Sequence, residues 1–448
     1  MRRDASECLT AALSSCVSGP GGLECVRVTT CPAYRGDCGI GQARTIISGF
    51  TYVYGLAAGA TAKRIARAGP WIMLYAMARI GTIAAVALLL IPEAALSDWS
   101  TYKSSRVDSL IQQFMTPRPG RASAPALSIA IGMGGEAVLA KGFGEARGDV
   151  PASATTVYHI GSLTKQFTAA AVLRLIEGGA RAPLSQAPLT LDTPMRDVFE
   201  GVERWTAADE PPITVRSLLT MTSNLPNFTL HPPREVDPWG AVETPRLLAA
   251  LKKLPPHGWP NTFEYSNTSY FLLARVIEAS APRPTTSRAY VRSEIIDRAG
   301  LKRTGFVDDY ALGSDVAQPH YRRRPAFAQP NWLDGCGDMA SNVLDLFHWN
   351  KVLMDGGLIG AEGRAAMFSD AARVDPVMYY GMGWFVGHDG EWDSYHHSGS
   401  VPGYTSYNAI LRNRRSGEWL SVTLLTNSDG VDDLDRLADE VIDVALER

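Results

Sequence analysis

The order of strand-like and helix-like segments along the chain predicts an α+β fold. Strand-like runs occur at Ala126–Ile131 and again within 406–426, and the helical patterns concentrate between these two regions. Strands that are far apart in sequence can share one sheet. We therefore expect the two ends of the folded region to build one antiparallel sheet, flanked by helices, with the middle of the chain forming a helical insertion.

Length and composition are those of a globular protein. The 448 residues suffice for one large domain or two ordinary ones, and 46% of them are hydrophobic while 20% are charged. The formal net charge of -3 argues against a surface that binds nucleic acid. A small-molecule or peptide substrate is the partner that this composition leaves open.

The first 97 residues differ from the rest of the chain. Five of the six cysteines lie there, at Cys8, Cys16, Cys25, Cys31 and Cys38. Their spacing contains no C-x-x-C pair, so neither a zinc site nor a particular disulfide framework has specific support. We expect no metal and no cofactor.

An apolar segment at about 69–97 has two interpretations. Residues 69–91 could form a membrane-spanning signal anchor, but Arg79 would then lie near its middle at a cost of about 2.5–3.5 kcal/mol. Alternatively, Met77-Ala-Arg79 is the basic start of a secretory signal peptide, and Ile80–Ile91 is its apolar core. Ala95-Leu-Ser97 is then the cleavage site.

The signal-peptide interpretation sets the predicted domain boundaries. Residues 1–97 form an N-terminal extension, and residues 98–448 form the folded domain, exported to the periplasm or the extracellular space. Residues 1–76 would then not belong to the native protein. The anchor interpretation instead predicts attachment to a membrane through about 69–91. In the exported chain Cys336 is the remaining cysteine, so no internal disulfide can form. The stability of the exported chain must then come from its hydrophobic core.

The first predicted elements of this domain follow from apolar spacing. Apolar residues at helical intervals predict an amphipathic helix over Arg106–Met115. Ala126–Ile131 and Ala137–Ala140 are strand-like and are joined by the turn Gly132-Met-Gly-Gly135, which predicts a hairpin. A buried helix begins near Ser162 and is ended by Gly178-Gly179.

The later elements follow in the same way. Proline and polar residues dominate 180–260, with a short helix over Val215–Met221, and helical patterns return at 268–277 and 345–354. Strands are expected at Met382–Val386, Ser406–Leu411 and Leu420–Thr426, and a final helix within Val431–Leu446.

Ser162 and Lys165 form a Ser-x-x-Lys pair at the start of the buried helix. Residues three apart on a helix share a face, so the two side chains can touch. A nucleophilic serine needs an adjacent base, and a lysine desolvated among apolar side chains can serve as one. By itself the pair is weak evidence of catalysis, because a capping serine with a solvated lysine gives the same pattern.

Two further motifs change this assessment. Tyr265-Ser-Asn267 comes just before a helical run, and His397-Ser-Gly399 comes just before a strand region. With these motifs the chain, from about Ala124 to its last helix, resembles the serine hydrolases of the β-lactamase-related family. That family includes class C β-lactamases, D-alanyl-D-alanine carboxypeptidases, D-aminopeptidases and related esterases. The resemblance implies a β-lactamase/transpeptidase-like fold.

The resemblance also implies roles for individual residues. Ser162 would be the nucleophile, Lys165 its proton acceptor or the group that tunes it, and Tyr265 the proton shuttle to the leaving group. Asn267 would hold the substrate's carbonyl or the lysine, with a simple helix N-cap as the alternative. The remaining implied residues belong to the third motif: His397, Gly399 and Ser400.

In that motif His397 would line the site on a strand, although His396 competes for the assignment. Gly399 would let substrate approach the strand, and the backbone N–H groups of Ser162 and Ser400 would form an oxyanion hole. Since histidine ordinarily titrates near 6.5, we expect carboxylate-bearing substrates to be favoured below about that pH.

The chain departs from the family pattern in two places. Met221 and Asn224 stand where relatives commonly have His and Gly, and residues 180–190 resemble an insertion.

The implied activity is hydrolysis of an amide or ester, such as a D-alanyl peptide or a small ester, through an acyl-enzyme. The alternatives are a class C-type β-lactamase and a penicillin-binding receptor without turnover. A metal hydrolase and an α/β-hydrolase are disfavoured, because the sequence contains neither H-E-x-x-H nor G-x-S-x-G. The exact substrate cannot be derived from these motifs.

Overall fold

The computed structural model describes residues 13–19 and 22–28 and, within 99–447, all but 117–124, 203–204, 206–210, 235–242, 257–260, 311–314, 322–332, 430 and 432. The apolar segment at 69–97 lies outside the described residues. The chain divides into two units, Met1–Glu93 and Ala94–Arg448. In the first unit, β1 (Leu13–Gly19) and β2 (Gly22–Val28) pair as an antiparallel hairpin. No helix in the described part of the chain combines the length and the apolar composition that a membrane crossing requires.

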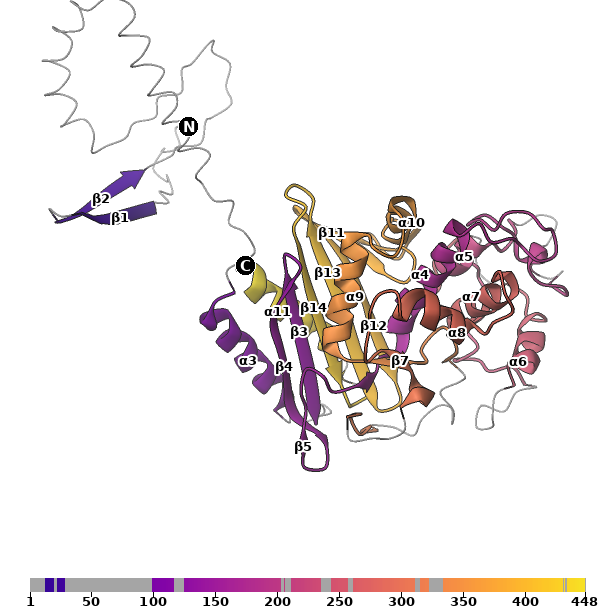
Figure 1. The fold of residues 1–448 in the computed structure, drawn as a ribbon, viewed down its shortest axis with the longest axis horizontal. Coiled ribbons are helices and arrows are strands. Elements are labelled where there is room, and N and C mark those ends of the chain that lie inside the picture. Colours follow the sequence, from indigo (N-terminus) through magenta and orange to yellow (C-terminus); the bar gives the residue numbers. More distant parts are fainter. Residues whose placement is uncertain are drawn as a thin grey trace, which may run out of the picture. The chain divides into compact units, whose positions relative to one another are not determined.

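The second unit is built on a nine-stranded antiparallel sheet (Figure 1). The strand order is β5-β4-β3-β14-β13-β12-β11-β10-β9. The strands are β3 (Ala126–Met133), β4 (Glu136–Arg147), β5 (Val150–Pro151), β9 (Ala372–Arg373), β10 (Met378–Tyr380), β11 (Phe385–Asp389), β12 (Trp392–Val401), β13 (Tyr404–Asn413) and β14 (Trp419–Thr426). Strand β3 pairs with β14, from Leu127 opposite Thr426 to Met133 opposite Leu420. Both ends of the domain therefore build one sheet, which confirms the predicted α+β architecture.

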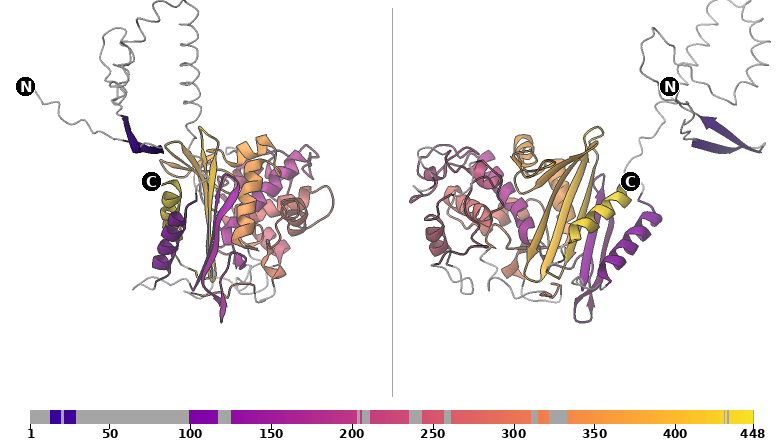
Figure 2. Two further views of the ribbon diagram at one scale, coloured as in Figure 1. Left: turned by 60° about the vertical axis from the view of Figure 1, so that its left-hand side comes forward. Right: turned by 180° about the vertical axis from the view of Figure 1, so that it is seen from behind.

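One face of the sheet is covered by the first and last helices of the domain, α3 (Thr101–Met115) and α11 (Leu434–Leu446) (Figure 2). Val107, Ile111 and Phe114 of α3 are buried against apolar residues of α11 and the strands. The predicted helix over 106–115 thus exists, but it begins earlier because Ser100 caps it: the Ser100 hydroxyl accepts a hydrogen bond from Lys103 N at 3.2 Å.

The opposite face carries the helices of the middle of the chain (Figure 2, left). These are α4 (Thr164–Glu177), α5 (Val215–Leu219), α6 (Thr244–Leu251), α7 (Asn267–Ser280), α8 (Ser287–Val291), α9 (Val343–Asp355) and α10 (Ala361–Met367). A small sheet of β6 (Tyr158–His159), β8 (Met339–Ser341) and β7 (Gly305–Phe306) lies among them. Helix α4 is buried along most of its length, as its apolar sequence predicts.

The predicted strand at Met382–Val386 is wrong over its first three residues. Strand β11 begins at Phe385, and Gly383 has a φ of +83° in a turn. A Cβ on Gly383 would stand 2.8 Å from the carbonyl oxygen of Lys165. The turn therefore lies against α4, where an extended strand would not fit. Helices α6, α8 and α10 and strands β5, β9, β10 and β12 of the large sheet have no counterpart among the predicted elements.

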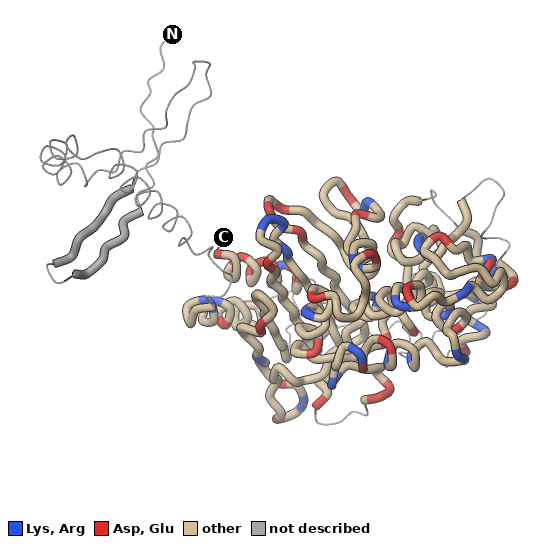
Figure 3. Tube along the Cα trace, turned by 45° about the horizontal axis from the view of Figure 1, so that its top comes forward, with Lys and Arg blue, Asp and Glu red and all other residues tan. Residues whose placement is uncertain are grey.

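Basic and acidic residues are interspersed along this unit (Figure 3). The sequence at 180–190 forms a tight loop, closed by hydrogen bonds from Ala182 N to Ala187 O at 2.9 Å and from Leu189 N to Ala180 O at 2.7 Å. Residues 180–190 thus form a compact loop between α4 and Leu191, and that this loop is an insertion stays a prediction.

Candidate active site

Ser162 lies on a single 3-10 turn, Gly161–Leu163, that connects β6 to α4. Gly161 has a φ of +50°, a conformation that glycine adopts without strain. A Cβ on Gly161 would stand 3.0 Å from the backbone nitrogen of Ser400 on β12. The turn therefore holds the Ser162 side chain, which is partly exposed, directly beside strand β12.

Lys165 is in the first turn of α4, and its side chain is 0% exposed. Its ammonium group donates to Ser162 Oγ at 2.9 Å, to Asn267 Oδ1 at 2.8 Å and to the carbonyl oxygen of Cys336 at 2.7 Å. A lysine has three N–H donors, so each one has an acceptor here. This arrangement fixes the position of the nitrogen against the serine and offsets the cost of burying it.

Tyr265 reaches Ser162 from the other side. Its hydroxyl donates to Ser162 Oγ at 2.8 Å, and Lys165 Nζ lies 4.9 Å from the centre of its ring. The serine oxygen thus lies between a phenol and an ammonium group. Either group, once deprotonated, can take the serine proton over one hydrogen bond.

Asn267 is the first residue of α7, while Ser266 occupies the N-cap position. The side-chain oxygen of Asn267 accepts from Lys165, and its Nδ2 donates to Thr229 Oγ1 at 2.8 Å. Of the roles predicted for Asn267, the structure shows contact with the lysine, and the helix N-cap alternative is wrong. The Thr229 contact fixes the orientation of the amide.

His397 is buried (1% exposed), and both of its ring nitrogens have partners. Nδ1 donates to the carbonyl oxygen of Ser398 at 2.6 Å, which leaves Nε2 to accept from the Tyr380 hydroxyl at 3.3 Å. Burial first, and the nearby Lys165 second, lower the pKa of His397 to about 3. The expectation that this ring titrates near 6.5 is therefore wrong. The prediction that carboxylate-bearing substrates are favoured below that pH depends on it and is wrong as well.

The competing His396 points away from the nucleophile. Neighbouring residues on a strand alternate between the two faces of the sheet, and His396 stacks on Phe385 and Tyr407. The ring of His397, in contrast, lies 6.0 Å from that of Tyr265. The structure thus places His397, and not His396, on the side of Ser162.

Gly399 and Ser400 lie on β12 beside the 3-10 turn. A Cβ on Gly399 would stand 2.2 Å from the carbonyl oxygen of Ile160 and 3.0 Å from Ser162 N. Gly399 is thus required because the protein's own backbone approaches it closely. The sequence had instead predicted that this glycine lets substrate approach the strand. The same approach places the turn that carries Ser162 against the part of β12 that carries Ser400, and an oxyanion hole built from their two N–H groups stays a prediction.

The segment Leu333–Asp338 supports the site, and sequence reasoning missed it. Besides the Cys336 carbonyl that binds Lys165, the Gly335 carbonyl accepts from Thr168 Oγ1 at 2.7 Å. The buried Asp338 accepts from Gly335 N at 3.2 Å and so holds the turn. Burial and the neighbouring Asp334 raise the pKa of Asp338 to about 7. Carbonyl groups have no sequence signature, so no motif could have revealed this support.

Met221 and Asn224, where the chain departs from the family pattern, both have positive φ, +58° and +54°. A glycine at 224 would adopt this conformation without strain. Met221 Sδ accepts from Ser266 N at 3.3 Å, and the carbonyl oxygen of Leu225 accepts from Ser266 Oγ at 2.9 Å. This loop therefore holds the residue next to Tyr265.

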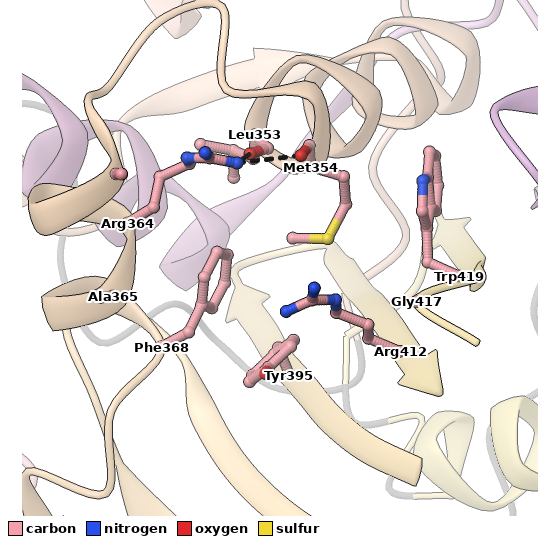
Figure 4. Close-up of a pocket in the computed structure, with 10 residues that line it drawn as sticks. Leu353, Met354, Arg364, Ala365, Phe368, Tyr395, Arg412, Gly417 and Trp419 are labelled. Atoms are coloured by element: carbon pink, nitrogen blue, oxygen red, sulfur yellow. Dashed lines mark hydrogen bonds between the residues drawn. The ribbon is translucent and has the colours of Figure 1, made fainter. Parts of the chain in front are cut away.

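The hollow shown in Figure 4, with a volume of about 480 Å³, is not this site. It lies between α9, α10 and strands β12–β14, and its lining includes neither Ser162 nor Lys165. Within the described residues, no group of His, Cys, Asp and Glu has an arrangement that could hold a metal ion.

Comparison with known proteins agrees with this geometry. PbpX of Bacillus subtilis (strain 168) is 24% identical over 62% of this chain and 65% of its own length. This chain therefore spans less than two thirds of that relative. A penicillin-binding protein homologue from Pyrococcus abyssi has a TM-score of 0.63 at 25% identity, covering 77% of this chain and 78% of its own.

The D-amino acid amidase from Ochrobactrum anthropi SV3 shares the fold, with a TM-score of 0.61 at 20% identity, over 78% of this chain and 99% of its own. The family model for Beta-lactamase matches residues 107–447, a range that contains all the residues of the site. This chain belongs to the Beta-lactamase family.

Proposed function

We propose that this protein is a serine hydrolase that cleaves an amide or ester through an acyl-enzyme on Ser162. The observation that carries the proposal is the position of Ser162 Oγ, at 2.9 Å from Lys165 Nζ and 2.8 Å from the Tyr265 hydroxyl. A serine becomes nucleophilic when a neighbouring group takes its proton, and two such groups lie within one hydrogen bond.

The proposed reaction uses these contacts and starts from the form of the site in which one of the two groups, Tyr265 or Lys165, is deprotonated. Ser162 Oγ attacks the substrate carbonyl as its proton passes to that group. The N–H groups of Ser162 and Ser400 stabilise the negative charge on the carbonyl oxygen. Tyr265 then returns the proton to the leaving amine or alcohol, and water attacks the acyl-enzyme by the reverse sequence. Asn267 and the Cys336 carbonyl keep Lys165 in place throughout.

The third motif, His397-Ser-Gly399, favours substrates that carry no carboxylate next to His397. A neutral, buried His397 provides no fixed positive charge, and its Nε2 is already bonded to Tyr380. A β-lactam carries a carboxylate and would lack a cationic partner there. We therefore favour a small ester or a D-amino acid amide or D-alanyl peptide, a choice supported by the shared fold with the D-amino acid amidase.

The test is a panel of p-nitrophenyl esters, D-amino acid amides, D-alanyl-D-alanine peptides and a chromogenic cephalosporin. Hydrolysis of at least one ester or amide should be lost in Ser162→Ala, and a fluorophosphonate should label Ser162 in the unaltered protein. The cephalosporin should turn over far more slowly than the best ester. Labelling of a different serine would contradict the proposal, and cephalosporin turnover equal to that of the best ester would restore the β-lactamase alternative.

Burst kinetics separate the enzyme from a penicillin-binding receptor. An enzyme releases product continuously, whereas a receptor releases one equivalent of product per protein and then stops. Continuous release from the best substrate is the expected result.

A further inference from the structure

A groove with a volume of about 580 Å³ lies on the face of the sheet opposite to Ser162, between β10–β13 and the exposed side of α11. Strand β12 separates the two: His397 points toward Ser162, while its neighbours His396 and Ser398 line the groove. The groove is therefore distinct from the proposed hydrolytic site, although it shares a strand with that site.

The floor of the groove is an aromatic ladder across three strands. The ring of His396 on β12 stacks on Phe385 of β11, with centroids 5.6 Å apart, and on Tyr407 of β13, with centroids 5.8 Å apart. In both pairs the rings lie within 20° of parallel, at 18° and 19°. The ladder offers a broad π surface, which attracts both apolar groups and cations.

The walls carry negative charge. Five aspartates line the groove, and no lysine or arginine does so among the described lining residues. Three of them, Asp435, Asp439 and Asp443, follow one another at intervals of four along α11, and none has an ion pair within the part of the chain that the structure describes. Like charges at this spacing destabilise a helix, so the arrangement costs stability in the empty groove.

Polar groups inside the groove also lack partners. The Tyr407 side chain is 6% exposed, and its hydroxyl has no hydrogen-bond partner in the described structure. Neither ring nitrogen of His396 has one there either. Burial first, and the neighbouring Asp439 and Asp435 second, raise the pKa of Tyr407. None of these atoms belongs to the fully enclosed polar atoms without a partner, so they reach the open groove and are accessible to a ligand.

We propose that this groove binds a small organic cation with an apolar or aromatic body. The cationic nitrogen would lie over the Tyr407–His396 part of the ladder, beside Asp435 and Asp439, and the apolar body would extend toward Phe385. Aromatic faces combined with carboxylates form the environment in which substituted ammonium groups bind well. An anion would meet five aspartates, and a neutral apolar molecule would leave Asp435, Asp439 and Asp443 without a cationic partner.

Benzyltrimethylammonium is the probe, with benzyl alcohol and benzoate as neutral and anionic counterparts, titrated calorimetrically into the full-length protein. The cation should bind at least about tenfold tighter than benzyl alcohol, and benzoate should not bind. Asp435→Asn combined with Asp439→Asn removes two charges without changing size and should weaken the cation at least about tenfold. Tyr407→Leu should also weaken it, because the ring is lost.

Glu440→Gln is the matched control, since Glu440 is on the same helix but outside the groove and lies 3.7 Å from Arg436. This variant should bind the cation unchanged. Unaltered ester hydrolysis in every variant reports that each remains folded. Equal affinity for the cation and benzyl alcohol, or equal weakening by Glu440→Gln and the double variant, would overturn the proposal.

Discussion

At the residue scale, the position of Lys165 is set by partners from three separate segments. Ser162 lies one turn before it, Asn267 begins α7, and Cys336 contributes only its carbonyl oxygen. The first two could be predicted, because the Ser-x-x-Lys and Tyr-x-Asn motifs name the side chains involved. The third could not, since any residue at position 336 supplies the same carbonyl group.

Lys165→Ala and Tyr265→Phe should each lower the hydrolysis rate by at least about 10²-fold, the usual scale of general acid–base catalysis. Because the two groups contact the same oxygen, the double variant should lose much less than the product of the single losses. Steady-state and single-turnover rates on the best substrate measure this. Tyr404→Phe is the control: its hydroxyl bonds the carbonyl of Ala317, so its loss should leave the rate unchanged. Multiplicative losses would contradict a shared proton relay.

The buried His397 makes stability depend on pH. Its pKa is about 3 in the folded protein and 6.5 as its ordinary value, so between these values the unfolded chain binds more protons. Stability should therefore fall as pH is lowered from about 6.5 toward 3, by on the order of 1.4 kcal/mol per pH unit for such a group. His397→Asn should flatten this part of a plot of Tm against pH.

His388 makes stability depend on pH in the opposite direction. Hydrogen bonds to Asp393 and Asp370 raise the pKa of His388. The stability that His388 contributes is therefore fully present below pH 6.5 and is lost as pH rises through the raised pKa. His388→Asn should lower Tm at pH 5 more than at pH 9. The same pH dependence in both histidine variants would be inconsistent with the contacts seen here.

At the element scale, helix α9 depends on an arginine from the next helix. Arg364 of α10 donates to the carbonyl oxygens of Met354 at 2.9 Å and of Leu353 at 3.3 Å, at the end of α9 (Figure 4). These carbonyls have no partner within the helix, and a positive charge there also complements the helix dipole.

Arg364→Met should lower the free energy of unfolding by about 1–2 kcal/mol, because two carbonyl groups lose a charged donor. Arg412→Met is the control: Arg412 lines the same hollow but is exposed and forms no ion pair within the described residues. Urea unfolding of both variants measures the difference. An equal loss in both would show that the guanidinium does not cap α9.

Most elements could be predicted from the sequence, and the exceptions have identifiable causes. The hairpin β3–β4 and helices α4, α7 and α11 follow from apolar periodicity. The turn at Gly383 could not be predicted, since its conformation is imposed by contact with α4. Gly399 lies beside Ser162, and the group that approaches it, the Ile160 carbonyl, could not be predicted because it comes from a segment far away in sequence.

At the scale of the whole molecule, the apolar layer on the α3–α11 face of the sheet is built, within the described part of the chain, from Trp99 and residues that follow it. Trp99 Nε1 donates to Ser104 Oγ at 2.7 Å, and α3 then completes the apolar layer with α11. A protein of residues 98–448 should therefore fold and hydrolyse the best substrate at the rate of the full chain. A protein of residues 117–448 lacks α3, exposes that layer and should be aggregated or inactive. Circular dichroism and hydrolysis assays distinguish the two.

We also propose that the chain is exported after cleavage behind Ser97. N-terminal sequencing of the exported protein should find Asp98 as the first residue. An intact N-terminus in the membrane fraction would instead support the signal anchor over about 69–91.

The pairing of β3 with β14 has a consequence for synthesis. A ribosome releases β3 early, but its partner β14 emerges only after α10 and strands β9–β13 have been made. The growing chain thus carries Ser162 and Lys165 long before β12 supplies the Ser400 N–H group, and β12 in turn is made before β14 joins it, through β13, to β3. Nascent and prematurely terminated chains should therefore be hydrolytically silent, and the serine acquires its reactivity only when translation is nearly complete.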